Sequence, residues 1–170
     1  MELKWTLLNS ARGLRYDTVQ EVMRLAFYLW NQKTDIDFIE IPKNEVGSPG
    51  KTKEDIEILV SFVTENHGDP YPFDGPGRTL AHAFYPLTNN GLSGDVHFDD
   101  HEEYTYKSQR GKNLLWVATH ELGHSLGLEH SRNRDAVMYP WYTAYNENMK
   151  LLDDDILGIQ TLYGEFLFFG

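Results

Sequence analysis

Three histidines fall within an eleven-residue stretch, His120 to His130, and their spacing constrains the fold more than any other feature of this 170-residue chain. His120 and His124 are four residues apart, so on a helix both imidazoles leave the same face and can bind one metal ion. Gly127 can adopt the positive φ that ends a helix, which lets the chain turn and bring His130 to the same ion. Three nitrogen ligands leave the fourth tetrahedral position open, which is typical of a catalytic zinc that lowers the pKa of a bound water to roughly 7. The stretch therefore predicts a helix, a turn and a catalytic zinc, with Glu121 beside the ligands.

A short His-Glu-x-x-His match also arises by chance on ordinary amphipathic helices, and this alternative has to be weighed. The match here is longer than that. The third histidine, the glycine at the bend and a turn at Met138-Tyr139-Pro140 all fit one metalloprotease pattern. The extended match favours a metal site over a coincidence.

Ser131 directly after the third histidine, followed by Ala136-Val137-Met138-Tyr139-Pro140, resembles the catalytic domain of the matrix metalloproteinases, or matrixins, of the metzincin clan. Related families carry Glu, Asp or Pro where Ser131 stands. The resemblance runs from about Lys4-Trp5 to Leu162-Tyr163-Gly164 and implies a zinc metallopeptidase catalytic domain over residues 1–164. Residues 165–170 lie past the end of that domain, as the start of a linker or a remnant of expression.

Composition is consistent with one globular domain. The chain is 41% hydrophobic, enough for one sizeable core, and it has no cysteine for disulfides or thiolate metal sites. A net charge of −11 disfavours binding to nucleic acid. Residues 1–20 lack the apolar run of a secretory signal, and no stretch is long and apolar enough to span a membrane. A secreted protein would therefore have lost its leader.

Hydrophobic periodicity predicts an α+β fold. A helix is expected over residues 17–31, with Asp17 and Gln20 as a capping box. Its buried stripe should comprise Val19, Val22, Met23, Ala26, Phe27 and Trp30. Further helices are expected over 113–126 and 153–163, strands over 36–41, 56–63, 80–85 and 95–98, and a polar loop over 42–55.

The order of these elements suggests a twisted mixed sheet packed on helices. The resemblance adds detail, implying a metzincin or zincin-like α/β sandwich with a five-stranded sheet and about three helices. The loop over 42–55 and the stretch 87–94 are longer than the family pattern leads us to expect.

A second set of potential ligands comprises His67, Asp69, His82 and His97. Four protein ligands with no vacancy describe a closed, structural zinc site. Spacing alone is only suggestive, because scattered histidines are commonly surface or packing residues. The resemblance supplies the missing specificity, since the family pattern places a structural zinc on these four positions. His101 matches no ligand position and is expected to be exposed.

Acidic residues crowd among glycines in 65–74 and 95–103, where the plain alternative is a solvated acidic surface. Oxygen donors suit calcium, and the resemblance implies one to three calcium ions. The first would be held by the side chains of Asp74, Asp99 and Glu102 and the carbonyls of Gly75, Gly77 and Thr79. The second, less secure because Glu57 replaces the usual Asp, would use Asp95, Glu57 and the carbonyls of Gly91 and Ser93. A third site would involve Asp100.

The ligand set and the resemblance together imply hydrolysis of internal peptide bonds. A zinc-bound water, deprotonated by Glu121, would attack the substrate carbonyl, and Glu121 would return the proton to the leaving amine. Met138 would form an apolar floor beneath the histidines, which differs little from an ordinary core methionine. An extended peptide would pair with an edge strand at Leu80-Ala81, while Pro140-Trp141-Tyr142 would form the far wall of its side-chain pocket.

Trp116 stands one helical turn before His120. In the family, this position helps to set the depth of the pocket for the first residue after the cleaved bond, so a tryptophan predicts a preference for small or medium side chains. The alternative is that the indole turns away into the core between helix and sheet.

The resemblance implies a secreted or cell-surface enzyme acting on extracellular or matrix proteins, monomeric, with protein inhibitors of matrixins among its partners. Two rivals stay open. One is a catalytically silent module that keeps its metals for stability and binds peptides, against which Glu121 argues. The other is a different metzincin peptidase, against which Ser131 argues.

Overall fold

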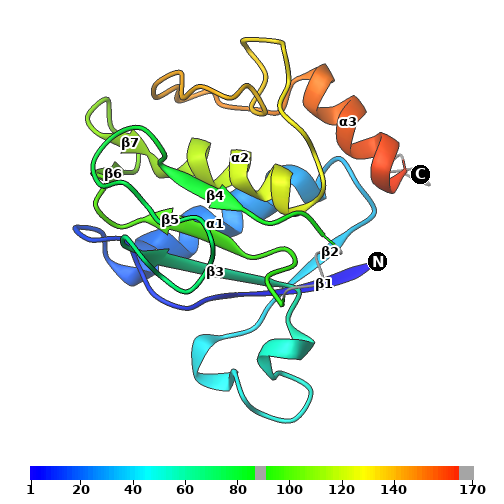
Figure 1. The fold of residues 1–170 in the computed structure, drawn as a ribbon. Helices are drawn as coiled ribbons and strands as arrows, with labels where there is room; N and C mark the ends of the chain where they lie inside the picture. Colours follow the sequence, from blue (N-terminus) through cyan, green and yellow to red (C-terminus); the bar gives the residue numbers. More distant parts are fainter. Residues whose placement is uncertain (87–90, 165–170) are drawn as a thin grey trace.

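The computed structural model describes residues 1–86 and 91–164. The tail predicted at 165–170, and residues 87–90 of the stretch predicted to be long, lie outside these ranges. Figure 1 shows a twisted sheet with helices above and behind it. The five-stranded order is β2-β1-β3-β5-β4, in which only β4 is antiparallel to its neighbour. These strands are β1 (Glu2–Leu7), β2 (Asp37–Glu40), β3 (Ile58–Val63), β4 (Ala81–Ala83) and β5 (Val96–Asp99).

The helices of the described part are α1 (Tyr16–Asn31), α2 (Leu114–Ser125) and α3 (Asp153–Tyr163). The predicted α+β class, mixed five-stranded sheet and three helices are confirmed. None of these helices is both long and apolar enough to cross a membrane.

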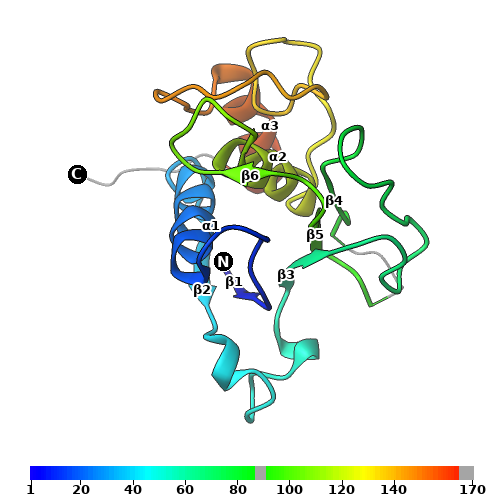
Figure 2. The ribbon, with the colours of Figure 1, turned by 90° about the vertical axis from the view of Figure 1, so that its left-hand side faces the viewer.

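The stripe predicted for α1 is confirmed in full, since all six of its members are buried. This face packs against α2 within the main core (Figure 2), and the Trp30 Nε1–H donates to the carbonyl of Thr119 at 3.0 Å. The hydrogen bond satisfies the polar atom of a fully buried indole. Helix α2, which carries His120 and His124, is thereby held against the amphipathic helix α1.

The capping box predicted at the start of α1 is wrong. Arg15 is the N-cap residue and makes no side-chain cap. The Asp17 carboxylate instead pairs with the Arg15 guanidinium, and the Gln20 amide donates to Glu40 on β2 at 2.6 Å. The Gln20 side chain, which the local pattern assigned to the capping box, therefore bonds a distant residue on the sheet.

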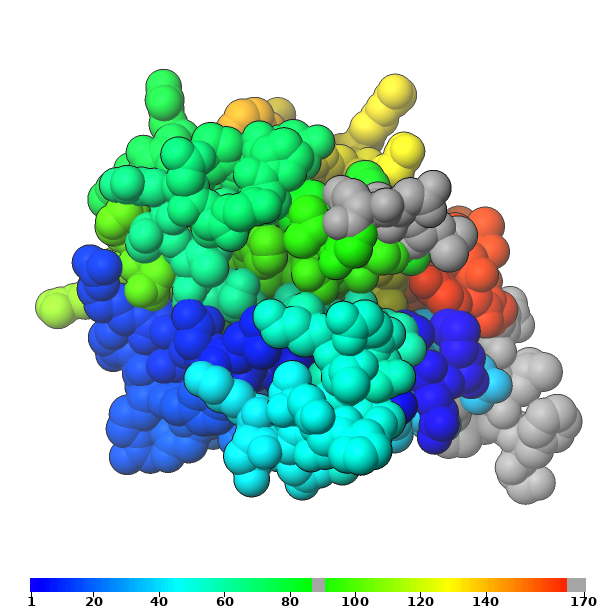
Figure 3. Space-filling model, turned by 60° about the horizontal axis from the view of Figure 1, so that its bottom comes forward, coloured from blue at the N-terminus to red at the C-terminus, as the bar shows by residue number. Residues whose placement is uncertain are grey.

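The predicted loop over 42–55 contains two single-turn 3₁₀ helices, η1 (Lys43–Glu45) and η2 (Lys53–Asp55). A capping box does occur here, between Thr52 and Asp55. The loop forms a lobe that lies below the strands in Figure 1 and is coloured cyan in Figure 3, and the Lys4 ammonium donates to the carbonyl of Gly50 at 3.2 Å. The lobe therefore lies on the side of the sheet opposite α2.

Sequence periodicity did not identify three of the strands. β1 carries a polar start and a buried end, so it lacks clean alternation. β6 (Tyr104–Thr105) and β7 (Lys112–Asn113) form a two-residue ladder that is too short for any periodic signal.

Candidate active site

Helix α2 presents the first two histidines of the motif. Its N-cap is Asn113, whose side chain accepts the Trp116 N–H at 2.9 Å, and nearly all of its residues are buried. At its end Gly127 has a φ of +101°, the left-handed conformation that the motif predicts for the turn. The turn returns His130 to the helix, leaving 3.1 Å between its Nε2 and that of His124. The structure thus brings His120, His124 and His130 together, with potential ligand atoms all within 4.8 Å of one another.

Backbone carbonyls orient two of these imidazoles. Nδ1 of His120 lies 2.6 Å from the carbonyl of Val137, and Nδ1 of His124 lies 2.7 Å from that of Leu128. Each Nδ1–H donates to its carbonyl, so Nε2 is left to face a metal. Burial lowers the pKa of all three histidines, that of His120 to about 3. The rings are therefore neutral, as metal ligation requires.

Glu121 lies in the same cleft but outside the ligand cluster. It is 7% exposed, and burial raises its pKa to about 8. A carboxyl group with a pKa near neutrality can both accept and release a proton. A divalent cation on the neighbouring histidines would favour its ionised form.

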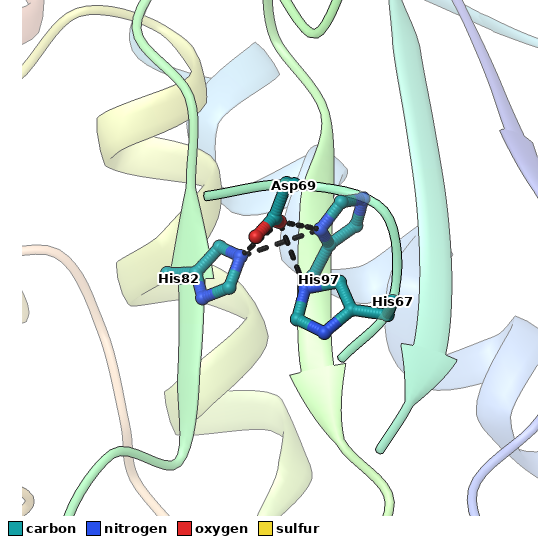
Figure 4. Close-up of side chains that lie close together, drawn as sticks. All are labelled: His67, Asp69, His82 and His97. Atoms are coloured by element: carbon teal, nitrogen blue, oxygen red, sulfur yellow. Dashed lines mark hydrogen bonds and ion pairs between the residues drawn. The ribbon is translucent and has the colours of Figure 1, made fainter. Parts of the chain in front are cut away.

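The second predicted cluster is also assembled (Figure 4). One oxygen of Asp69 lies 2.8 Å from Nε2 of His67, Nε2 of His82 and Nδ1 of His97. Burial alone would raise the pKa of Asp69, but the Tyr71 N–H and the hydrogen bonds from His82 and His97 outweigh it and lower the pKa to about 2. The cluster joins the loop before β4 to strands β4 and β5. Its nitrogen and oxygen donors fit a closed zinc site.

A cleft of about 890 Å³ runs between β4 and the segment 140–142. Strand β4 lies at the edge of the sheet, so a backbone edge faces the cleft. Glu121 and the three histidines of α2 and its turn lie in its floor. All six residues predicted to contact substrate also line it, namely Leu80, Ala81, Trp116, Pro140, Trp141 and Tyr142.

The profile of the matrixin family of peptidases matches residues 1–164. The chain belongs to the matrixin family. Human matrilysin is 43% identical over 95% of this chain, and the match spans 59% of matrilysin. Human matrix metalloproteinase-15 is also 43% identical, and rat macrophage metalloelastase is 45% identical, each over 95% of this chain. The matches span only 24% and 32% of those two relatives.

Matrixins are zinc-dependent endopeptidases, and the two histidine clusters of this matrixin suit metal binding. Trp116 is 8% exposed. Its indole belongs to the core but also lines the cleft, stacked on His120 with centroids 5.1 Å apart. Tyr142 meets it edge-on at 5.3 Å. The indole therefore lies beside the metal cluster rather than away from the cleft.

The residue of this matrixin that sequence reasoning missed is Asp155. Its buried carboxylate accepts the N–H groups of Val137, Met138 and Leu152, each at 3.0 Å. It thereby ties α3 to the turn beneath the histidines. The run Asp153-Asp154-Asp155 offered a signal, but it reads equally well as the acidic first turn of a helix.

Met138 lies under α2, as predicted for an apolar floor, and is 2% exposed. A Cβ atom on Gly123 would stand 2.2 Å from its sulfur. Only glycine at position 123 lets the methionine approach so closely.

The first predicted calcium site contains an unsatisfied carboxylate. Asp99 is fully buried, and its Oδ2 has no hydrogen-bond partner in the described structure. Burial raises the pKa of Glu102, and the charges of Asp99 and Asp74 raise it further. The orphaned oxygen of Asp99, with the charges of Asp74 and Glu102 nearby, suits a bound cation, although the three carboxylates do not form a close ligand cluster in the described structure. The Gly77 N–H donates to Glu102, so the loop that contains Gly75, Gly77 and Thr79 lies next to this carboxylate.

The second predicted calcium site is less complete. Asp95 is buried and its pKa is raised by burial to about 6, although the Leu59 N–H donates to it at 3.2 Å. One oxygen of the Glu57 carboxylate accepts the Lys4 N–H at 2.7 Å. Gly91 and Ser93 lie in the adjoining turn. Asp100, predicted for a third site, accepts the Arg12 N–H at 2.6 Å.

The prediction that His101 is exposed is wrong. Its side chain is 27% exposed, and Nδ1 is buried 3.5 Å from an Asp99 oxygen. The ring lies beside the carboxylate of Asp99, which stands two residues earlier in the chain.

Proposed function

We propose that this chain is a zinc-dependent endopeptidase domain that cleaves extended segments of extracellular or matrix proteins. The observation that carries the proposal is Glu121, a buried carboxyl group in the floor of the cleft beside three neutral imidazoles. A silent binding module would have no need of a group poised to transfer protons.

His120, His124 and His130 would hold the catalytic zinc, whose Lewis acidity polarises the scissile carbonyl. Glu121 takes a proton from the attacking water and delivers it to the nitrogen of the leaving amine. The carbonyls of Val137 and Leu128 keep the histidine rings in place while this happens. Met138 supports the ring cluster from below without taking part in proton transfer.

His67, Asp69, His82 and His97 would hold a second, structural zinc, and Asp74, Asp99 and Glu102 a calcium ion. A second calcium at Asp95, with Glu57, Gly91 and Ser93, has weaker support. These ions would fix the loop before β4 in position, and β4 forms one wall of the cleft. Their role is thus to shape the substrate site.

The substrate would lie along the edge of β4 at Leu80-Ala81, with its backbone pairing with the strand. The side chain after the scissile bond would enter between Trp116 and Tyr142, with Pro140 and Trp141 beyond. Because Trp116 is bulky, Ala, Val or Leu should be preferred there. Residues 1–164 would form the catalytic domain, acting outside the cell as a monomer, and protein inhibitors of matrixins would block the same cleft.

Cleavage of a quenched peptide library, with and without a zinc chelator, tests this function. We expect cleavage that the chelator abolishes and added zinc restores. Peptide binding without turnover, in a zinc-loaded sample, would instead support the silent module.

A further inference from the structure

The two ends of the cleft differ in charge. At one end Tyr85 packs edge-on against His124 at 5.8 Å. At the other end lie Trp116 and Tyr142, and two cationic residues, Arg78 and Lys112, line the same cleft. Among the described residues that line the cleft, Glu121 is the only acidic one, and it is buried in the floor. The exposed charges of the cleft lining are therefore positive, whereas the protein as a whole has a net charge of −11.

Both cationic residues belong to the Trp116 end. The Lys112 ammonium lies 5.2 Å from the ring centroid of Tyr142, which itself contacts Trp116. Arg78 follows Gly77, whose N–H donates to Glu102, and the Lys112 N–H donates to the carbonyl of Glu103 at 2.8 Å. Both residues therefore flank the single turn at 102–103. Figure 1 shows β7 and the loop leading into β4 on the same side of the molecule, at the left of the view.

Neighbouring carboxylates do not remove this charge from the cleft. The Arg78 guanidinium lies 3.7 Å from Asp74, but its side chain is 83% exposed. Glu102 lies near Lys112 but is 6% exposed and turned toward Gly77. Neither Asp74 nor Glu102 lines the cleft. Arg78 and Lys112 can therefore meet a charge on the substrate.

We infer that Arg78 and Lys112 select substrates with an acidic side chain at the second or third residue after the scissile bond. The inference rests on the proposed peptidase function and on Trp116 marking the pocket for the first residue after that bond. An extended chain advances about 3.3–3.4 Å per residue, so the next two residues pass the segment between Arg78 and Lys112. A carboxylate there gains attraction to two cations, whereas a lysine is repelled.

The experiment uses one neutral parent peptide with Gln, Glu or Lys at the second or third position after the cleavage site. Exposed charge pairs contribute modestly, so kcat/KM should be about threefold to tenfold higher for Glu than for Gln, and lower again for Lys. The preference should shrink in high salt because the charges are solvent-accessible.

Arg78→Asn suits this test, because Arg78 has a φ of +62° that asparagine tolerates. Arg78→Asn and Lys112→Gln should each reduce the ratio of kcat/KM for the Glu peptide to that for the Gln peptide, and the double variant should bring this ratio to about one. Arg110→Gln removes the same charge from an exposed residue outside the cleft lining and should retain the preference.

Equal cleavage of Glu, Gln and Lys peptides by the unaltered protein would overturn the inference and leave the peptidase function intact. A preference that Arg110→Gln reduces as much as the double variant would also overturn it, because net charge would then be the cause. A gain in kcat/KM that is confined to peptides ending in a free carboxylate at these positions would also overturn the inference. Failure to cleave any peptide would overturn both proposals.

Discussion

The two histidine clusters use a carboxylate in opposite ways. In the cluster of His67, Asp69, His82 and His97, the carboxylate touches all three imidazoles, and the side chains are at most 19% exposed. In the cluster of His120, His124 and His130, Glu121 stands outside the ligand set and the site opens into the cleft. A carboxylate inside the set closes the site, while one beside it leaves a position for chemistry. Position relative to the ligands, rather than residue type, separates the two roles.

The variant Glu121→Gln is the most direct test of the difference between the two carboxylates. We expect the variant to keep about two zinc ions per chain yet to lose about 10²–10⁴-fold in peptidase activity, or roughly 3–5 kcal/mol of barrier. Metal analysis and turnover on the same sample decide the matter. Near-full activity would remove Glu121 from the mechanism.

Asp69→Asn tests the other carboxylate. Removing a buried charge that accepts several hydrogen bonds should lower the free energy of unfolding by about 3 kcal/mol and release one zinc. Activity toward small peptides should fall far less than in Glu121→Gln. Asp37→Asn, on an exposed position of β2, serves as the control. Loss of both zinc ions from Asp69→Asn would show that the clusters are not independent.

Calcium binding tests the first cluster separately, because it should stabilise the loop that carries His67 and Asp69. At a hundredfold excess over Kd, calcium should add about 2.7 kcal/mol and raise the melting temperature by roughly 5–10 °C. Asp99→Asn should abolish the increase, because it removes the orphaned carboxylate oxygen. A melting curve of the unaltered protein that does not respond to calcium would count against the site.

Asp155→Asn probes the support of the other cluster. The variant loses charge on a buried acceptor of three N–H groups, so it should be destabilised by about 2 kcal/mol and should bind its catalytic zinc more weakly. Asp154→Asn is a matched control, since its carboxylate bonds the exposed hydroxyl of Ser131. Equal effects in the two variants, measured by chemical denaturation, would contradict a specific role for Asp155.

The smallest expected effect is that of Trp116→Leu. The change should widen cleavage toward bulky side chains after the scissile bond by about 1–2 kcal/mol, with little change for Leu substrates. Peptides varied only at that position measure it. Identical profiles for the two proteins would show that the indole does not shape the pocket.

Local patterns predicted local structure well and long-range partners poorly. The stripe of α1 follows directly from a period of 3.6, and Gly127 follows from the need for a positive φ. The pairing of Gln20 with Glu40 depends on how the sheet folds. Asp155 was hidden for the same reason, because its partners lie more than fifteen residues away in the Met138 turn.

The close approach of Met138 to Gly123 bears on oxidative damage. Conversion of a methionine to its sulfoxide adds an oxygen atom to the sulfur. The Met138 sulfur is packed so tightly that even a methyl group on Gly123 would collide with it, and the side chain is 2% exposed. Peroxide should therefore attack Met1, which is 57% exposed, long before it reaches Met138. Sulfoxide at Met138 would thus report that the floor of the active site has opened.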